Sequence, residues 1–237
     1  MEKTLNILVT GASKGIGRAI ALEMSDKGNI FVTGRNEEAL KTIAAQGYCI
    51  CDLSKDITPL IKFIKENKID ILINNAGEYI YSAIDSATSE EIERIFSTNL
   101  IAPVKLISAS VPHMKEQKWG RIINIGSISG VMGEAYASLY SSTKSGLLGL
   151  TKALALELAE YNITVNTINP GWVETKLGLD SIEESEFSKE EIIECIPQKR
   201  FVKPEEVAKL CSYLITNDAK GITGQGINLC AGLSVGI

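Results

Sequence analysis

Short, almost wholly apolar runs alternate with longer segments of helical periodicity along the 237-residue chain. Strands buried on both faces of a parallel sheet read as continuous apolar runs, whereas helices covering a sheet repeat apolar residues at about every third or fourth position. The alternation therefore predicts an α/β fold, a doubly wound parallel sheet with helices on both faces. Its seven predicted strands are residues 5–10, 29–34, 48–51, 70–74, 121–126, 163–166 and 226–230.

Helical periodicity covers residues 16–27, 37–46, 58–67, 88–118 and 138–161, and a further helix starts at Pro204. Asn36 is a predicted helix cap, and Thr88 with Glu91 has the spacing of a capping box. Pro103 is expected to interrupt the helix over 88–118. The segment 138–161 is apolar nearly all round, so it requires burial on two sides, against the sheet and against another subunit.

No repeat, low-complexity tract or linker divides residues 1–237, so we predict one domain. Residues 176–200 are the irregular part, where apolar residues alternate with the acidic Asp180, Glu183, Glu184, Glu186, Glu190, Glu191 and Glu194. This segment is interpreted either as solvated surface helices or as a mobile lid over a ligand pocket, since insertions after strand ends lie over the ligand in such sheets. The lid is the preferred interpretation.

Composition narrows the class of partner. With 45% hydrophobic residues, 22% charged residues and a net charge of −5, the chain is globular and lacks the broad basic surface that a nucleic acid requires. The apolar run near the amino end is too short for a signal peptide or a membrane span. We expect a cytoplasmic protein without a membrane partner and with reduced thiols at Cys49, Cys51, Cys195, Cys211 and Cys230.

Candidate chemistry starts at a glycine-rich turn, TGASKGIG (10–17), between the first strand and the first helix. Glycines permit a tight turn and close approach of a pyrophosphate, and the helix amino end offers free N–H groups. The turn therefore favours nucleotide binding over a purely structural role. The single histidine, His113, argues against a Ser-His-Asp triad or a histidine-rich zinc site, and no metal is expected.

Over essentially its whole length the chain resembles the short-chain dehydrogenase/reductase family. Ser127 precedes Tyr140 by thirteen residues, the usual interval in that family. The resemblance implies a single-domain, Rossmann-type fold. It rests on motifs that occur in the family's order: TGASKGIG (10–17), Asp52-Leu53, NNAG (74–77), Asn99, Ser127, YSSTK (140–144) and PGWVET (170–175).

The resemblance implies an Asn99, Ser127, Tyr140 and Lys144 catalytic set. Tyr140 would donate a proton to a carbonyl oxygen as hydride reaches the carbon. Lys144 shares a helix face with Tyr140, and its ammonium is expected to lower the phenol pKa and to bind the nicotinamide ribose. Ser127 would hold the substrate oxygen, and Asn99 a water that links Lys144 to solvent. The alternative, ordinary structural roles in a member that has lost activity, stays open.

The cofactor is expected across the carboxyl ends of the strands. By resemblance, Asp52 bonds the adenine amino group, unless it merely caps a turn. No acidic residue stands at the end of the second strand, where Gly34 precedes Arg35; an arginine there binds a 2′-phosphate unless it is a solvated loop residue. NADP(H) is therefore predicted, held by Gly11, Ser13, Lys14, Gly15, Ile16, Gly17, Arg35, Asp52, Leu53, Asn75, Ala76, Gly77, Tyr140, Lys144, Pro170, Gly171, Val173 and Thr175.

Within the family the chain most resembles 3-oxoacyl-carrier-protein reductases of fatty acid synthesis and polyketide ketoreductases, through GRIINIGSISG (120–130) and ITGQGINLCAGL (222–233). Those carrier-protein reductases usually have an arginine where this chain has Tyr161. A basic dock for acidic carrier protein is expected near the entrance, unless these residues are a solvated face: Lys115, Lys118 and Arg121. Trp172 is expected to narrow the pocket or stack on a flat substrate.

Three functions follow from this resemblance. The first is an NADPH-dependent reductase of a 3-oxoacyl thioester, linked to carrier protein or CoA, or of a related polyketide. The second is an oxidoreductase of a free alcohol or ketone, such as a sugar, sterol or small cyclic compound. The third is a nucleotide-binding regulatory protein without turnover. The family resemblance also implies a homotetramer.

Overall fold

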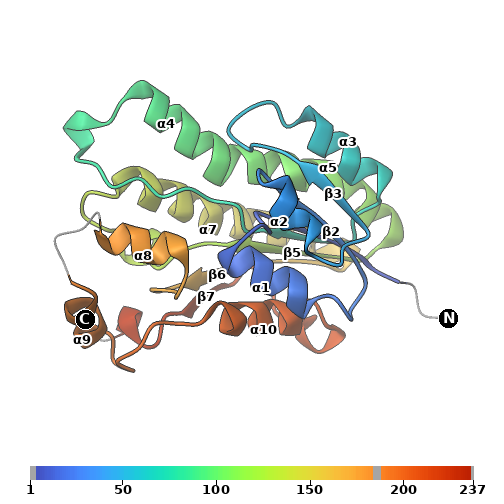
Figure 1. The fold of residues 1–237 in the computed structure, drawn as a ribbon. Helices are drawn as coiled ribbons and strands as arrows, with labels where there is room; N and C mark the ends of the chain where they lie inside the picture. The colour runs from blue at the N-terminus through green and yellow to red at the C-terminus, as the bar shows by residue number, and fades with distance from the viewer. Residues whose placement is uncertain (1–3, 184–187, 236–237) are drawn as a thin grey trace.

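The computed structural model describes residues 4–183 and 188–235 (Figure 1). One parallel sheet runs in the order β3-β2-β1-β4-β5-β6-β7, so the strand order reverses between β1 and β4. The predicted doubly wound α/β class is confirmed, and each predicted strand has its counterpart. The strands are β1 (Asn6–Thr10), β2 (Asn29–Gly34), β3 (Gly47–Ile50), β4 (Ile71–Asn74), β5 (Gly120–Ile125), β6 (Ile163–Pro170) and β7 (Gly226–Leu229).

Helices cover both faces of the sheet (Figure 1). One face is packed by α1 (Gly15–Glu23) and α10 (Pro204–Leu214). The other is packed by α3 (Thr58–Glu66), α5 (Ala102–Gln117) and α7 (Ser138–Leu158). Shorter or peripheral helices are α2 (Glu37–Lys41), α4 (Ser89–Phe96), α6 (Ser129–Met132), α8 (Lys176–Glu183) and α9 (Lys189–Cys195).

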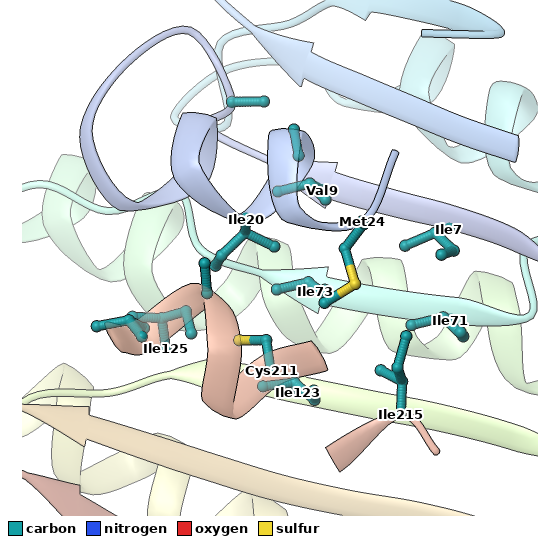
Figure 2. Packing of buried hydrophobic residues seen from close by; sticks show 14 of the residues in the cluster. Ile7, Val9, Ile20, Met24, Ile71, Ile73, Ile123, Ile125, Cys211 and Ile215 are labelled. Carbon is teal, nitrogen blue, oxygen red and sulfur yellow. The ribbon is translucent and has the colours of Figure 1, made fainter. Parts of the chain in front are cut away.

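The apolar runs of the strands arise because both sheet faces are buried. Ile7 and Val9 of β1 point into the cluster beneath α1 and α10, whereas Leu8 points into the cluster beneath α3, α5 and α7. Figure 2 shows Met24, the residue after α1, and Cys211 of α10 among the strand side chains of the first cluster. Successive strand residues face opposite layers, so neither position can be polar without a partner.

The long helical run does not break where the proline predicts. Ser97–Ile101 form a π-helical turn between α4 and α5, and Pro103 then lies in the first turn of α5. The widened turn already disrupts the regular hydrogen-bond ladder there, so the missing N–H of proline costs little. The run Ser89–Gln117 contains an 18-residue window with the mean hydropathy (1.2) of a membrane span, but 44% of that window is buried inside the protein, as in a helix that covers a sheet.

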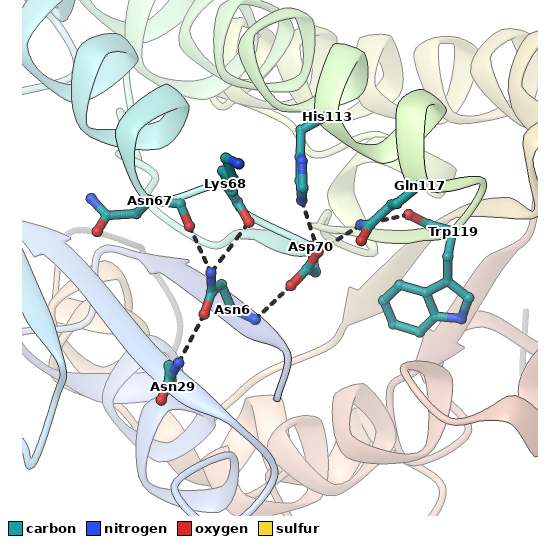
Figure 3. Close-up of polar contacts among 8 residues, drawn as sticks. All are labelled: Asn6, Asn29, Asn67, Lys68, Asp70, His113, Gln117 and Trp119. Carbon is teal, nitrogen blue, oxygen red and sulfur yellow. Dashed lines mark hydrogen bonds and ion pairs between the residues drawn. The ribbon is translucent and has the colours of Figure 1, made fainter. Parts of the chain in front are cut away.

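At the amino ends of the strands, buried Asp70 joins three elements (Figure 3). Its carboxylate accepts the backbone N–H of Asn6 at 2.8 Å and the side-chain amide of Gln117 at 2.6 Å. The Nε2 atom of His113 lies 3.0 Å from Asp70 Oδ1. This network fixes β1 and the last turns of α5 to the start of β4, at the edge opposite the carboxyl ends of the strands.

We expect Asp70→Ala to lower the free energy of unfolding by about 2–4 kcal/mol, because it leaves buried donors without an acceptor. Chemical denaturation measures the change. Asp26→Ala is the matched control, since Asp26 is a largely exposed aspartate and should lose less than about 0.5 kcal/mol. Equal stabilities of the two variants would contradict a structural role for the network.

Candidate active site

A cavity of about 1090 Å³ opens along the carboxyl ends of the strands, on both sides of the switch between β1 and β4. This is where doubly wound sheets bind their ligands. The structure brings almost the whole predicted site together in its wall. Among the predicted residues, Gly17 and Asn99 are the two that do not line it.

The glycine turn at one end of the cavity depends on its glycines. Gly11 and Gly15 have φ values of +66° and +56°, which residues with a Cβ rarely adopt. A Cβ on Gly17 would lie 2.3 Å from the side-chain nitrogen of Asn75. That nitrogen donates to the carbonyl of Thr10, so the turn is fastened to the end of β4. Gly17 therefore lies behind the cavity wall, where its lack of a side chain permits the turn to pack closely against Asn75.

Thr10 has a role here that the sequence did not single out. Its hydroxyl oxygen accepts the backbone N–H groups of Asn75 and Ala76, both at 2.9 Å. The chain after β4 is thereby held against the glycine turn. Its position, directly before the first glycine at a strand end, was the available signal.

A side chain at the end of β2 would have to displace the Ser13 hydroxyl. A Cβ on Gly34 would stand 2.6 Å from the hydroxyl of Ser13. The exposed Arg35 follows and lines the cavity together with Lys14. Asp52 lines it as well, while its Oδ1 accepts the backbone N–H of Ser54 at 3.0 Å. One carboxylate oxygen of Asp52 therefore caps a turn, as the alternative interpretation predicted.

At the centre of the cavity, Ser127 follows β5 and Tyr140 lies in the first turn of α7. Desolvation raises the pKa of Tyr140 to about 12, a hydrogen bond from Ser127 acts in the opposite direction, and the charge of Glu134 raises the pKa further. At neutral pH Tyr140 is therefore a neutral phenol with a proton to give.

Desolvation outweighs the predicted lowering of the Tyr140 pKa by Lys144, so this pKa lies above its usual value. The Lys144 ammonium donates to the carbonyl of Ile125 at 2.8 Å and lies 5.5 Å from the Tyr140 ring centre. Burial lowers the pKa of Lys144 to about 8. Lys144 is thus held at the end of β5, and desolvation has the largest effect on the pKa of the Tyr140 phenol.

Asn99 lies in the π-helical turn, behind the cavity wall. Its Oδ1 accepts the backbone N–H of Glu78, and its Nδ2 donates to the carbonyl of Glu78, each at 2.8 Å. Nδ2 is also 3.2 Å from the hydroxyl of Thr143. Its side chain positions the chain that follows β4 next to α7, while the water that was predicted to join it to Lys144 stays a prediction.

Sequence reasoning missed an acidic group beside these residues. Glu134 precedes α7 and accepts hydrogen bonds from the hydroxyls of Tyr79 (2.7 Å) and Ser129 (2.5 Å). The Tyr79 ring packs edge-on against Tyr140, with centroids 5.1 Å apart. The available signals were the position of Tyr79 two residues after NNAG and of Glu134 between Ser127 and Tyr140.

Aromatic side chains dominate the end of the cavity away from the glycine turn. Tyr81 and Tyr136 contact each other with centroids 5.4 Å apart, and Trp172 stacks on Phe201 at 6.0 Å. The segment proposed as a lid contributes Lys176, Leu177, Gly178, Ser181, Glu191, Ile192 and Cys195 to the wall. Glu184 and Glu186 lie outside the described residues, so their part in that prediction has no structural counterpart.

The expected basic dock is not beside the cavity mouth. Arg121 is fully buried, lies over the ring of Trp119 and donates to the carbonyls of Gly120 and Asn162. Lys115 and Lys118 are at the end of α5, next to the amino ends of the strands. Since the cavity opens at the carboxyl ends, this patch is at the opposite edge of the same protomer. The prediction was wrong because a strand residue was counted as surface.

Comparison with known proteins agrees with this geometry. Residues 5–186 match the family model described as short chain dehydrogenase. The chain is 35% identical over 247 residues to the 3-oxoacyl-(acyl-carrier-protein) reductase of Staphylococcus aureus, covering 98% of this chain and 99% of that protein. It is 33% identical to the D-beta-hydroxybutyrate dehydrogenase of Rhizobium meliloti, covering 97% and 98%. A crystal structure of a single-substitution variant of the actinorhodin polyketide ketoreductase with NADPH superimposes with a TM-score of 0.92 at 34% identity, covering 99% of this chain and all of that one.

Proposed function

The chain belongs to the short chain dehydrogenase family, and we propose that it reduces the keto group of a 3-oxoacyl thioester, linked to carrier protein or CoA, or of a related polyketide. The observation that carries this proposal is the position of Tyr140. Its protonated hydroxyl lies beside Ser127 and between the glycine turn and the aromatic end of one cavity. A proton donor is therefore placed where a carbonyl compound and a nucleotide can meet.

NADPH is the proposed cofactor and supplies the hydride when bound. The turn from Gly11 to Gly17, with the free N–H groups at the start of α1, fits a pyrophosphate. Arg35 and Lys14 line the same end of the cavity and suit a 2′-phosphate. The NADPH named with the actinorhodin ketoreductase structure supports this choice. Asp52, Asn75 and the other predicted residues of the wall would hold the remaining parts.

The protein's own groups account for the proton. Tyr140 donates its phenolic proton to the carbonyl oxygen, since a pKa of about 12 keeps it protonated at neutral pH. Ser127 holds that oxygen by a hydrogen bond. Lys144, with its pKa lowered to about 8, is still largely charged at pH 7 and stabilises the phenolate left behind.

The aromatic end of the cavity favours a neutral, extended or flat ketone. Tyr79, Tyr81, Tyr136 and Trp172 offer ring faces, and the nearby charge of Glu134 disfavours a free carboxylate. A 3-oxoacyl thioester or polyketide has this neutral character. A free ketone or alcohol is the alternative, which the likeness to D-beta-hydroxybutyrate dehydrogenase supports. The complete set of Asn99, Ser127, Tyr140 and Lys144 argues against a regulator without turnover.

A substrate panel tests the function. NADPH oxidation is followed with acetoacetyl-CoA, acetoacetyl carrier protein, cyclic diketones, acetoacetate and sugars. We expect the thioesters to have the highest kcat/KM. Preferential turnover of cyclic diketones, acetoacetate or sugars would replace the proposal by its alternative, and binding of NADPH without turnover of any carbonyl compound would refute a reductase.

We also propose a cytoplasmic homotetramer. The five cysteines are unpaired thiols. Apolar side chains are exposed on the outer helices, with Leu156 of α7 85% exposed and Ile101 and Val104 near the π-helical turn also exposed. An isologous contact would bury these side chains on both subunits, because each subunit contributes the same surface. In sedimentation velocity we expect a tetramer for the wild type and smaller species for Leu156→Glu, with Lys209→Glu, an exposed position on α10 across the sheet, as the control. A stable wild-type monomer at micromolar concentration would contradict this assembly.

A further inference from the structure

A chain of hydrogen bonds leads from the proposed proton donor to a carboxylate. Ser127 Oγ lies 3.2 Å from Ser129 Oγ, and Ser129 Oγ lies 2.5 Å from Glu134 Oε2. The other carboxylate oxygen, Oε1, accepts the hydroxyl of Tyr79 at 2.7 Å. Both serine side chains are buried and line the cavity. Ser127 also acts on Tyr140, because a hydrogen bond from Ser127 lowers the pKa of Tyr140.

The carboxylate determines the direction of every bond in this chain. An ionised carboxylate only accepts, so Ser129 must give its one hydroxyl hydrogen to Glu134. The contact between the two serines then requires Ser127 to be the donor. Ser127 Oγ also accepts the backbone N–H of Ser129 at 3.1 Å. With its own hydrogen engaged, Ser127 has none to donate to Tyr140.

We propose that Glu134 is a positioning residue of the reductase proposed above: through Ser129 it holds the Ser127 hydrogen away from Tyr140, so that Tyr140 keeps its proton until a substrate binds. The same carboxylate holds Tyr79, whose ring packs against that of Tyr140. Glu134 thus fixes both neighbours of the phenol. Before Ser127 can donate to a substrate oxygen, its hydrogen must leave Ser129.

The electrostatics of the site support this role. The charge of Glu134 raises the pKa of Tyr140, in addition to the larger effect of desolvation. The hydrogen bond with Ser127 lowers that pKa, and a phenolate gains it only when Ser127 donates. The other charged or titratable side chains of the described residues on this side of the cavity are Glu78, Tyr79, Tyr81, Tyr136, Lys144, Lys176, Glu191 and Cys195.

Glu134→Gln tests the proposal, because an amide can donate to Ser129 and reverse the chain. Ser127 is then free to donate to Tyr140. We expect the pKa of Tyr140 to fall by about one unit. The measurement is an alkaline titration of protein labelled with ¹³C at tyrosine Cζ, with the Tyr140 signal assigned from Tyr140→Phe.

Two further variants complete the test. Ser129→Ala breaks the chain but retains the charge of Glu134, and we expect a shift in the same direction. Glu116→Gln, an exposed glutamate at the far end of α5, should titrate as the wild type. An unchanged Tyr140 pKa in Glu134→Gln overturns the proposal, and so does a shift in Glu134→Gln without one in Ser129→Ala, because charge alone would then suffice. If Glu134→Gln does not fold, Ser129→Ala decides.

The titration needs no substrate, so this proposal and the proposed function can fail separately. If the protein reduces no carbonyl compound but the Tyr140 pKa shifts in the variants, the role of Glu134 stands and the proposed reductase function is refuted. If the protein is an active reductase but the Tyr140 pKa is the same in the Glu134 and Ser129 variants, the proposed function stands and the positioning role of Glu134 is refuted.

Discussion

Tyr140→Phe is expected to lower kcat roughly 10²–10⁴-fold, the usual contribution of a positioned general acid. Phenylalanine keeps the ring that packs against Tyr79 and removes only the hydroxyl beside Ser127. Fold and NADPH affinity should therefore be retained. The loss is measured with the best substrate of the panel, and circular dichroism and NADPH fluorescence verify fold and binding.

Tyr213→Phe is the matched control for this variant. Tyr213 is 47% exposed on α10 and does not line the cavity, so its loss should leave kcat within a factor of about two. Turnover by Tyr140→Phe close to that of the wild type would show that another group supplies the proton. A combined loss of NADPH binding would instead point to a structural role of the hydroxyl.

The fold could be predicted because each layer leaves its own periodicity. β1 reads as a continuous apolar run since Ile7 and Leu8 face different buried clusters. Boundaries were less certain. The helix predicted over 37–46 ends at Lys41, because Gln46 already bonds the carbonyl of Ile30 as the chain enters β3. The hydrophobic periodicity of a segment does not show that pairing with a neighbouring strand will end the helix early.

Site residues could be predicted where the local backbone geometry requires one residue type. They could not be predicted where the site forms from segments distant in the sequence. Gly11 and Gly15 carry positive φ values that only glycine adopts easily, so the turn is visible in the sequence. Glu134 acquires its role from Tyr79, 55 residues earlier in the chain. Likewise, desolvation of Tyr140 outweighs the nearby ammonium of Lys144, and burial depends on the whole fold.

The preference between the two nicotinamide cofactors should depend mainly on Arg35. A hydrogen bond to a charged partner contributes about 1.5–3 kcal/mol. After a discount for the exposure of Arg35, we expect a preference for NADPH over NADH of about ten- to hundredfold. Arg35→Asp should abolish or invert this preference, since it replaces attraction by repulsion. Lys14→Ala should reduce it less, because an ammonium on a flexible stem is a less directed partner.

The change should appear in the KM for cofactor, because a 2′-phosphate is remote from the transferred hydride and contributes equally to ground and transition states. It should also weaken with added salt, as exposed charge pairs do. Steady-state kinetics with both cofactors at two ionic strengths measure these effects. Lys62→Asp, an equal charge change on α3 away from the cavity, is the control and should leave the preference unchanged. If the wild type uses NADH as well as NADPH, Arg35 is a solvated loop residue and Gly34 merely leaves the site without a selective charge.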